Sequence, residues 1–182
     1  MRKRLREKYS DEMLANIYKQ PHNHISWEDH KFRVQVSIGL LKPILPLNSA
    51  ADLSAGDATI INSLDIDNKY IGDFASGYEY QGPIEKTIDE IPSVDLFICS
   101  ETIEHLDDPD TVLNKIREKT KWLLLTTPNG ENNDSNPEHY WGWDTEGIED
   151  MLKKSGFSTM MLNTLRCDGI PGAYNYQMWL AK

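Results

Sequence analysis

The sequence has little cysteine and no long apolar run. Among its 182 residues, the only cysteines are Cys99 and Cys167. They lie far apart in the sequence, and Cys99 is inside an apolar stretch. This count excludes a disulfide-stabilised scaffold and predicts two free thiols in a reducing compartment. No apolar run approaches the roughly 20 residues that a membrane span needs, and no apolar segment follows the basic start to make a signal peptide. We therefore expect a cytoplasmic protein with no membrane span.

Positive charge is scarce beyond the first eight residues. The chain has 19 basic and 29 acidic residues and a net charge of −10, yet five basic residues stand at the start: Arg2, Lys3, Arg4, Arg6 and Lys8. Because the remaining body is strongly acidic, it repels polyphosphate, and binding along duplex nucleic acid is disfavoured. The basic start is interpreted as a solvated helix end, and contact with an anion is the alternative.

Helical and strand patterns alternate along the chain. Apolar residues three to four apart predict helices over 1–20, 27–41, 58–64, 110–119 and 144–155, the last closed by Gly156. Apolar stretches predict strands ending at 52 and over 69–74, 84–88, 94–100, 122–127, 157–165 and 174–181. This order predicts an α/β, Rossmann-like domain over 47–182, preceded by a helical N-terminal segment over 1–46. We expect a mainly parallel sheet with helices on both faces and a C-terminal antiparallel hairpin.

Two loops that leave the predicted strands favour a nucleoside-containing cofactor. The first, from Asp52 to Ala58, contains Ser54 and Gly56 among other small residues, which let the backbone approach a ligand. An ordinary tight turn is the alternative. The second loop begins at Asp73, about twenty residues later, where a carboxylate is placed to accept hydrogen bonds from a ribose diol. Its alternative role is to cap a turn.

A third loop follows the strand that ends near Ser100 and contains Glu101, Glu104 and His105. On a helical turn these three side chains would share one face. They could hold a hard divalent cation or act as an acid and base pair. A later loop contains His139 and is expected to open on the same edge of the sheet.

In this order, the segments 52–58, 72–73, 100–106, 127–129 and 137–141 resemble the motifs of class I S-adenosylmethionine (SAM)-dependent methyltransferases, above all the ubiquinone-biosynthesis O-methyltransferases. The resemblance covers residues 48–160, and its most specific part is Ser-Glu-Thr-Ile-Glu-His-Leu at 100–106. It implies SAM as the cofactor, with Ser54 and Gly56 near the methionine part and Asp73 on the ribose hydroxyls. The implied cofactor-binding set is Asp52, Ser54, Gly56, Asp73, Ser100 and Glu101.

The same motifs are similar to those of the 2′-O-methyltransferases that act on the 3′ ends of small RNAs. That resemblance implies Mg²⁺ or another divalent metal, held by Glu101, Glu104, His105 and His139. The implied catalytic residues are Glu104, His105 and His139. Some ubiquinone-pathway enzymes resemble this arrangement too, so the ligand set alone does not select RNA.

Several features depart from the family pattern. Ser54 and Ala58 stand where glycine is usual, and Asp73 lies only 22 residues before Asp95, which leaves no room for the usual helix between the second and third strands. No acidic residue stands at 82–84, where the family often contacts the adenine amino group. A degenerate, non-enzymatic domain of the same fold is therefore one alternative.

The N-terminal segment and one aromatic group bear on the acceptor. Residues 1–46 are expected to cover the site, with the histidines at 22, 24 and 30 in a polar lid rather than a metal site. Tyr140, Trp141 and Trp143 either face a flat or sugar-like acceptor or pack in the core. The acidic body favours O-methylation of a small molecule or sugar over that of an RNA 3′-terminal ribose. The short chain points to a large-substrate partner or to a homodimer that completes the pocket.

Overall fold

The computed structural model describes residues 1–21, 23–130, 134 and 136–182. Its strands are β1 (Arg2–Arg4), β2 (Ser49–Asp52), β3 (Asn68–Asp73), β4 (Tyr80–Gln81), β5 (Val94–Ser100), β6 (Thr120–Pro128), β7 (Trp141–Trp143), β8 (Thr159–Leu165) and β9 (Tyr176–Ala181). Its helices are α1 (Asp11–Ile17), α2 (Glu28–Leu41), α3 (Thr59–Asn62), α4 (Ile84–Thr87), α5 (Pro109–Lys119) and α6 (Thr145–Lys154). Two 3₁₀ turns, η1 (Lys42–Ile44) and η2 (Ile103–His105), complete the set.

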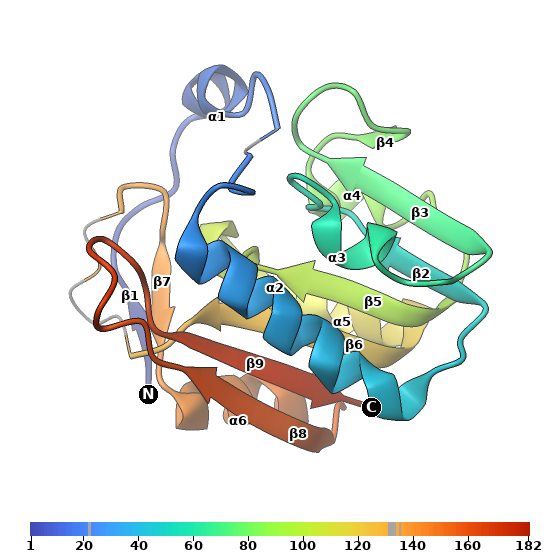
Figure 1. Cartoon of the computed structure of the whole chain (residues 1–182). Coiled ribbons are helices and arrows are strands. Elements are labelled where there is room, and N and C mark those ends of the chain that lie inside the picture. The colour runs from blue at the N-terminus through green and yellow to red at the C-terminus, as the bar shows by residue number, and fades with distance from the viewer. Residues whose placement is uncertain (22, 131–133, 135) are drawn as a thin grey trace.

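Seven strands form one sheet in the order β4-β3-β2-β5-β6-β9-β8 (Figure 1). The first five are parallel to their neighbours, whereas β9 is antiparallel to both β6 and β8. The predicted Rossmann-like sheet and its C-terminal antiparallel hairpin are therefore confirmed. The strand order reverses between β2 and β5, and ligands of such sheets bind beyond the carboxyl ends of the strands at this point.

Helices cover both faces of the sheet, as predicted. On one face, α2 and α3 pack on alternate residues of the central strands, among them Leu96 and Ile98. On the other face, α4, α5 and α6 pack on the intervening residues, among them Phe97 and Cys99. Figure 1 shows α2 running in front of the sheet, with α5 and α6 behind it. Because the centre of β5 is buried from both sides, residues 96–99 form a continuous apolar run, and each large side chain contributes about 1.5–3 kcal/mol.

The prediction of one helix over 1–20 is wrong. The segment instead forms β1, which pairs antiparallel with β7, and then the short helix α1, for which Ser10 is the N-cap. The guanidinium groups of Arg2 and Arg4 lie 4.0 and 4.7 Å from the Trp141 ring centroid, and they form ion pairs with Asp110 and Asp107. This contact with a distant strand outweighs the local helical pattern, and the basic start is not a solvated helix end.

The predicted strand at 84–88 is also wrong, because these residues form α4. Pro83 precedes the helix, and the isoleucines at 84 and 88 lie one turn apart, so both reach the core below β4. The strand that follows β3 along the chain is instead β4, which begins four residues before the expected strand. As predicted, no helix separates β3 from β4 in this fully described stretch.

The other predicted elements are confirmed within a few residues. Gly156 ends α6 with a φ of +81°, the conformation expected of a C-terminal cap. Within the described part of the chain, no helix has the length and apolar character that crossing a membrane requires.

Candidate functional site

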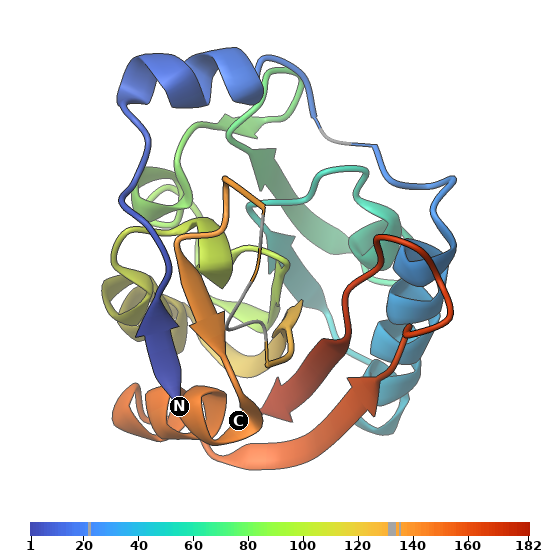
Figure 2. The same ribbon diagram turned by 90° about the vertical axis from the view of Figure 1, so that its left-hand side faces the viewer.

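One large cavity lies at the carboxyl ends of β2, β3, β5 and β6. Its volume is about 830 Å³, which is in the range of small-molecule sites. The loops that follow these strands form one side, and the N-terminal segment forms the other, with side chains from Lys8 to Val34. Figure 2 shows the chain passing from α1 across this edge of the sheet to α2. The N-terminal segment therefore lies next to the site loops, and its role as a lid stays a prediction.

The first two predicted loops meet in this cavity. The Gly56 N–H donates to Asp73 Oδ2 at 2.8 Å, and the Ser54 hydroxyl lies 2.7 Å from that of Thr102. Gly56 has a φ of +54°, and Ala58 has a φ of +55°. Ala58 thus adopts the left-handed conformation that the usual glycine would adopt without strain, at a cost of about 1 kcal/mol.

Asp73 caps the turn that follows β3. Its other oxygen, Oδ1, accepts the Ala75 N–H at 2.8 Å, so the carboxylate bonds to two backbone amides and is almost fully buried. A carboxylate has about four acceptor positions, so two remain for hydroxyl groups of a ligand. Asp52 lies nearby, and burial, together with the charge of Asp73, raises its pKa to about 7.

The third loop gathers three of the four predicted metal ligands. Each of Glu104, His105 and His139 offers one ligand atom, and these three atoms lie within 4.8 Å of one another. Glu104 is fully buried, and its Oε2 accepts the Thr127 hydroxyl at 3.0 Å, whereas its Oε1 has no hydrogen-bond partner among the described residues. Burial, followed by the charge of Glu101, raises the pKa of Glu104 to about 8. An unpartnered, buried carboxylate oxygen favours a cation or a bound proton.

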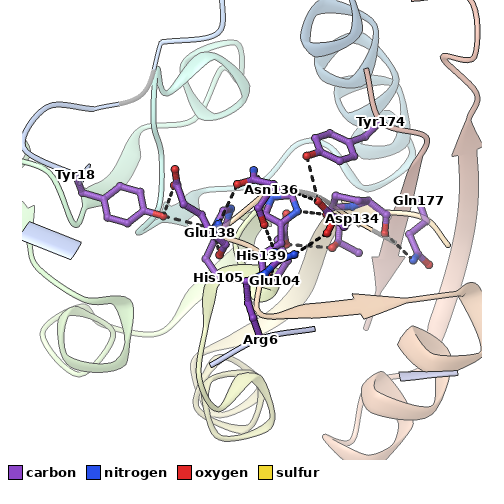
Figure 3. Close-up of polar contacts among 12 residues, drawn as sticks. Arg6, Tyr18, Glu104, His105, Asp134, Asn136, Glu138, His139, Tyr174 and Gln177 are labelled. Atoms are coloured by element: carbon purple, nitrogen blue, oxygen red, sulfur yellow. Dashed lines mark hydrogen bonds and ion pairs between the residues drawn. The ribbon is translucent and has the colours of Figure 1, made fainter. Parts of the chain in front are cut away.

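Both histidines of this group have a hydrogen-bond partner on Nδ1 (Figure 3). The Nδ1 of His105 lies 3.0 Å from the carbonyl oxygen of Glu138, which can only accept, so Nδ1 carries the proton. The Nδ1 of His139 bonds to Asp134, and the Asn136 amide donates to Nε2 at 3.1 Å. Each Nε2 therefore has a lone pair, and the partner on Nδ1 fixes each ring as in histidine metal sites.

The pair of His139 and Asp134 shifts both pKa values. Burial alone would lower the pKa of His139, but the hydrogen bond to Asp134 and the charge of Glu104 raise it overall. Burial alone would raise the pKa of Asp134, but the hydrogen bond to His139 lowers it overall. The imidazole is therefore a stronger base than an ordinary histidine.

Glu101 lies beside this group rather than within it. It has a φ of +52°, and its side chain accepts the Thr126 hydroxyl at 2.7 Å. Burial raises the pKa of Glu101, while the charge of Arg33 opposes the shift. Its charge raises the pKa of Glu104, so the two carboxylates are close enough to interact. The expectation that all four ligands share one compact group is thus only partly met.

Arg33 of α2 is a site residue that the sequence analysis missed. Its buried guanidinium donates to the Ser100 hydroxyl, to Thr126 Oγ1 at 3.3 Å and to His30 Nδ1 at 3.0 Å. The His30 Nε2 lies 3.0 Å from Asp57 in the first loop. Polar residues on the inward face of α2 recur three to four positions apart, at 29, 30, 33 and 37, and this spacing is the signal that could have revealed them.

Arg6 is a second missed residue. It donates to the carbonyl oxygens of Asp134 and His139, each at 2.6 Å, and to that of Asn136. A residue of the N-terminal segment therefore fixes the backbone around the His139–Asp134 pair. Nothing in the local sequence indicates this contact, because its partners lie about 130 positions away.

The aromatic group at 140–143 belongs to the packing of the fold. Tyr140 and Trp143 are each 1% exposed, and the Trp141 indole donates to the Leu106 carbonyl at 3.0 Å. Other aromatic residues line the cavity instead. Trp27 stacks on His24 with ring centroids 4.2 Å apart, and the remaining ones are Tyr18, Phe74, Tyr174 and Tyr176. The position at 22 lies outside the described residues. Within the described ranges, the only candidate metal group is that of Glu104, His105 and His139, so the lid histidines do not form one.

No family model matches the sequence, and no curated protein sequence matches it either. Solved structures do match. The 1,6-didemethyltoxoflavin-N1-methyltransferase of Burkholderia thailandensis, with 1,6-didemethyltoxoflavin and S-adenosylhomocysteine bound, has a TM-score of 0.71 at 11% identity, covering 97% of this chain and 91% of its own. The N-methyltransferase NodS of Bradyrhizobium japonicum WM9, in complex with S-adenosylhomocysteine, gives 0.70 at 8% identity, covering 93% and 96%.

The small RNA methyltransferase HEN1 has a TM-score of 0.61 at 19% identity, covering 84% of this chain. The present chain spans only 25% of the length of that HEN1 chain. At such identities the likeness establishes the fold, which is that of class I SAM-dependent methyltransferases.

Proposed function

We propose that this protein transfers the methyl group of SAM to an oxygen of a small-molecule or sugar acceptor. The observation that carries the proposal is the meeting of the first loop with Asp73 at the reversal of strand order. There, Gly56 and Asp73 are joined directly, and the cavity beside them is large enough for a cofactor and an acceptor. Two similar structures contain S-adenosylhomocysteine, which supports the same cofactor here.

The residues around the cavity suit the parts of SAM. The two remaining acceptor positions of Asp73 would bind the ribose hydroxyls, and the small residues Ser54 and Gly56 would admit the methionine part, beside Asp52. Ser100 and Glu101 would form the floor. Arg33 is the buried cation of this lining, so its guanidinium is the natural partner for the carboxylate of the methionine part. Residues 1–46 would act as the lid.

The chemistry requires positioning and the removal of one proton. SAM supplies an electrophilic methyl group, so the acceptor oxygen must lie in line with the breaking bond and lose its hydrogen. His139 would be the base, because Asp134 stabilises the imidazolium that forms, and the acceptor hydroxyl would replace the Asn136 amide as the donor to Nε2. His105 and Glu104 would hold the acceptor hydroxyl beside it.

The same three side chains fit a divalent metal. Glu104 offers an unpartnered buried oxygen, and each histidine offers Nε2, with Glu101 close by. One carboxylate and two imidazoles suit Mn²⁺ or Zn²⁺ at least as well as Mg²⁺. When bound, the metal would occupy Nε2 of His139, so that this residue would act as a ligand instead of as the base, and the metal would orient the acceptor hydroxyl and make it more acidic.

Two other functions have specific support. Methylation of an RNA 3′-terminal ribose is supported by the fold likeness to HEN1 and by the three candidate ligands. Against it stand the acidic body and the basic N-terminal side chains, which contact the protein itself: Arg2 pairs with Asp110, and Arg4 pairs with Asp107. A degenerate domain without activity is the other alternative, and it predicts no SAM binding.

Calorimetric titration of SAM into the purified protein, with and without Mn²⁺, tests the proposal. We expect saturable binding that Asp73→Asn weakens about 100-fold, because two charge-assisted hydrogen bonds are worth about 3 kcal/mol in total. Asp67→Ala, on an exposed side chain outside the cavity, is the matched control. Absence of SAM binding by the folded wild-type protein would refute the proposal and favour the degenerate domain.

A further inference from the structure

The cavity lining is rich in negative charge. Among the described residues that line it, nine are Asp or Glu and three are Lys or Arg. SAM would add one net positive charge, and a divalent metal at the histidines would add two. Even with both bound, the lining offers no excess positive charge to an anionic acceptor.

Three of the basic residues next to the cavity are engaged within the protein. Arg6 donates to three backbone carbonyls, and Arg33 donates to side chains at the ends of β5 and β6. Lys8 lies 3.7 Å from Asp11 on the lid. The fourth, Lys86, is exposed and forms no ion pair among the described residues, but it lies on α4 rather than on the loop that carries His139. A phosphate or carboxylate on an acceptor beside His139 would therefore have to compete with the contacts of Arg6 and Arg33.

Glu138 presents negative charge where the acceptor would lie. Its Oε2 accepts the Tyr18 hydroxyl at 3.0 Å, and its carbonyl oxygen bonds to the His105 ring (Figure 3). In the described part of the chain, it forms no ion pair with a lysine or arginine. The buried, unpartnered Oε1 of Glu104 faces the same cavity and is an independent sign that the site expects a hydrogen-bond donor or a cation.

Trp27 adds a ring surface to this lining. Its side chain is 54% exposed although it lines the cavity, and the His24 ring supports one face at an interplanar angle of 21°. An exposed indole attracts cations and stacks on flat or sugar rings, with about 0.5–1 kcal/mol at exposed sites. Acidic side chains and an aromatic face together recognise neutral or cationic rings.

We propose that the acceptor is a ring compound with no negative charge, preferably one with an amino group, that stacks on Trp27 and pairs with Glu138. This inference rests on the proposed function, because it concerns the acceptor half of the same cavity. It excludes acceptors with a phosphate or carboxylate near the methylated group. It also names two residues, Glu138 and Trp27, that set acceptor specificity without removing the proton.

The test is ligand-detected NMR with protein saturated with S-adenosylhomocysteine and Mn²⁺ replaced by diamagnetic Zn²⁺. Each of two sets of probes shares one ring and contains a neutral, a cationic and an anionic member: 4-methylcatechol, dopamine and 3,4-dihydroxybenzoate; and methyl glucoside, glucosamine and glucuronate. We expect binding to fall in the order cationic, neutral, anionic in at least one set. Glu138→Gln should reduce the cationic-over-neutral preference about fivefold, the effect of one partly exposed ion pair. Trp27→Ala should weaken binding of all members of that set, and of the cationic member most.

Glu118→Gln, at an exposed position of α5 outside the cavity, is the matched control and should change nothing. Equal or tighter binding of the anionic members would overturn the inference, as would binding of no probe at all by the cofactor-loaded protein. Unchanged selectivity in Glu138→Gln would overturn the role of that residue. Failure of S-adenosylhomocysteine itself to bind would be a failure of the proposed function, and the titration separates the two.

Discussion

Arg6 ties the N-terminal segment to the loop that carries His139, and its removal should show in both stability and titration. The guanidinium donates to three backbone carbonyls, those of Asp134, Asn136 and His139. A hydrogen bond from a charged donor contributes about 1.5–3 kcal/mol. Arg6 is only half-buried, so water would replace part of each contact in Arg6→Ala. We therefore expect a loss of about 2–4 kcal/mol in the free energy of unfolding rather than the full sum.

Urea unfolding followed by circular dichroism measures this loss, which corresponds to a decrease of roughly 5–12 °C in Tm for a chain of this length. Arg6→Lys keeps the charge but cannot reach three carbonyls at once, so it should recover less than half of the loss. Arg166→Ala is the control, because that side chain is 81% exposed and pairs only with its neighbour Asp168. Its expected effect is below about 0.5 kcal/mol.

A second readout separates positioning from general stability. The hydrogen bond to Asp134 raises the pKa of His139 against the effect of burial. If Arg6 keeps His139 and Asp134 at hydrogen-bonding distance, the pKa of His139, measured by NMR, should fall toward its ordinary value in Arg6→Ala. A variant within 0.5 kcal/mol of wild type, or a destabilised variant with an unchanged His139 pKa, would refute this role.

Three further variants test other parts of the structure. The pKa of Glu104 is about 8 in the folded protein against an ordinary value near 4.5, so the wild-type protein loses free energy of unfolding as the pH rises between these values. The free energy of unfolding of Glu104→Gln, measured with urea in the absence of metal, should therefore rise by more than about 1 kcal/mol relative to that of wild type between pH 5 and pH 8. Equal pH profiles of the two proteins would contradict the shift. Ala58→Gly should stabilise the protein by about 0.5–1 kcal/mol or leave it unchanged, since its φ of +55° strains alanine, and a clear loss in calorimetric Tm would show that the methyl group's packing matters more. Gly147→Ala should cost about 1–3 kcal/mol, because the added Cβ would lie 2.6 Å from the Met1 carbonyl oxygen, whereas Gly169→Ala, with open space around it, should have little effect in the same assay.

The parts of the fold that could be predicted are those whose signal lies within one segment. The apolar run of β5 is visible because both faces of that strand are buried, so nearly every residue from Val94 to Cys99 is apolar. The site loops follow directly from such strands, and their relative position follows from the parallel order of the sheet. For this reason Gly56, Asp73 and Glu104 could be assigned to one site before the structure was known.

The parts that could not be predicted depend on contacts between distant segments. Arg2 to Arg4 has no strand-like pattern, and only the ladder with β7 and the stacking on Trp141 make it a strand. In the same way, the partners of Arg33 lie at the ends of β5 and β6, more than 60 positions away. The two isoleucines at 84 and 88 fit either a strand or one helical turn, and the preceding Pro83 decides for the helix.

The N-terminal segment is a structural part of the site rather than a cover laid over a finished one. Arg6 fixes the backbone around His139, Tyr18 donates to Glu138, and Arg33 reaches Ser100 from the opposite side. These contacts come from three successive parts of residues 1–46, so displacement of this segment would disturb His139, Glu138 and Ser100 together. Under the proposed function, acceptor entry would then be coupled to the position of the base, since Tyr18 contacts the same loop that carries His139.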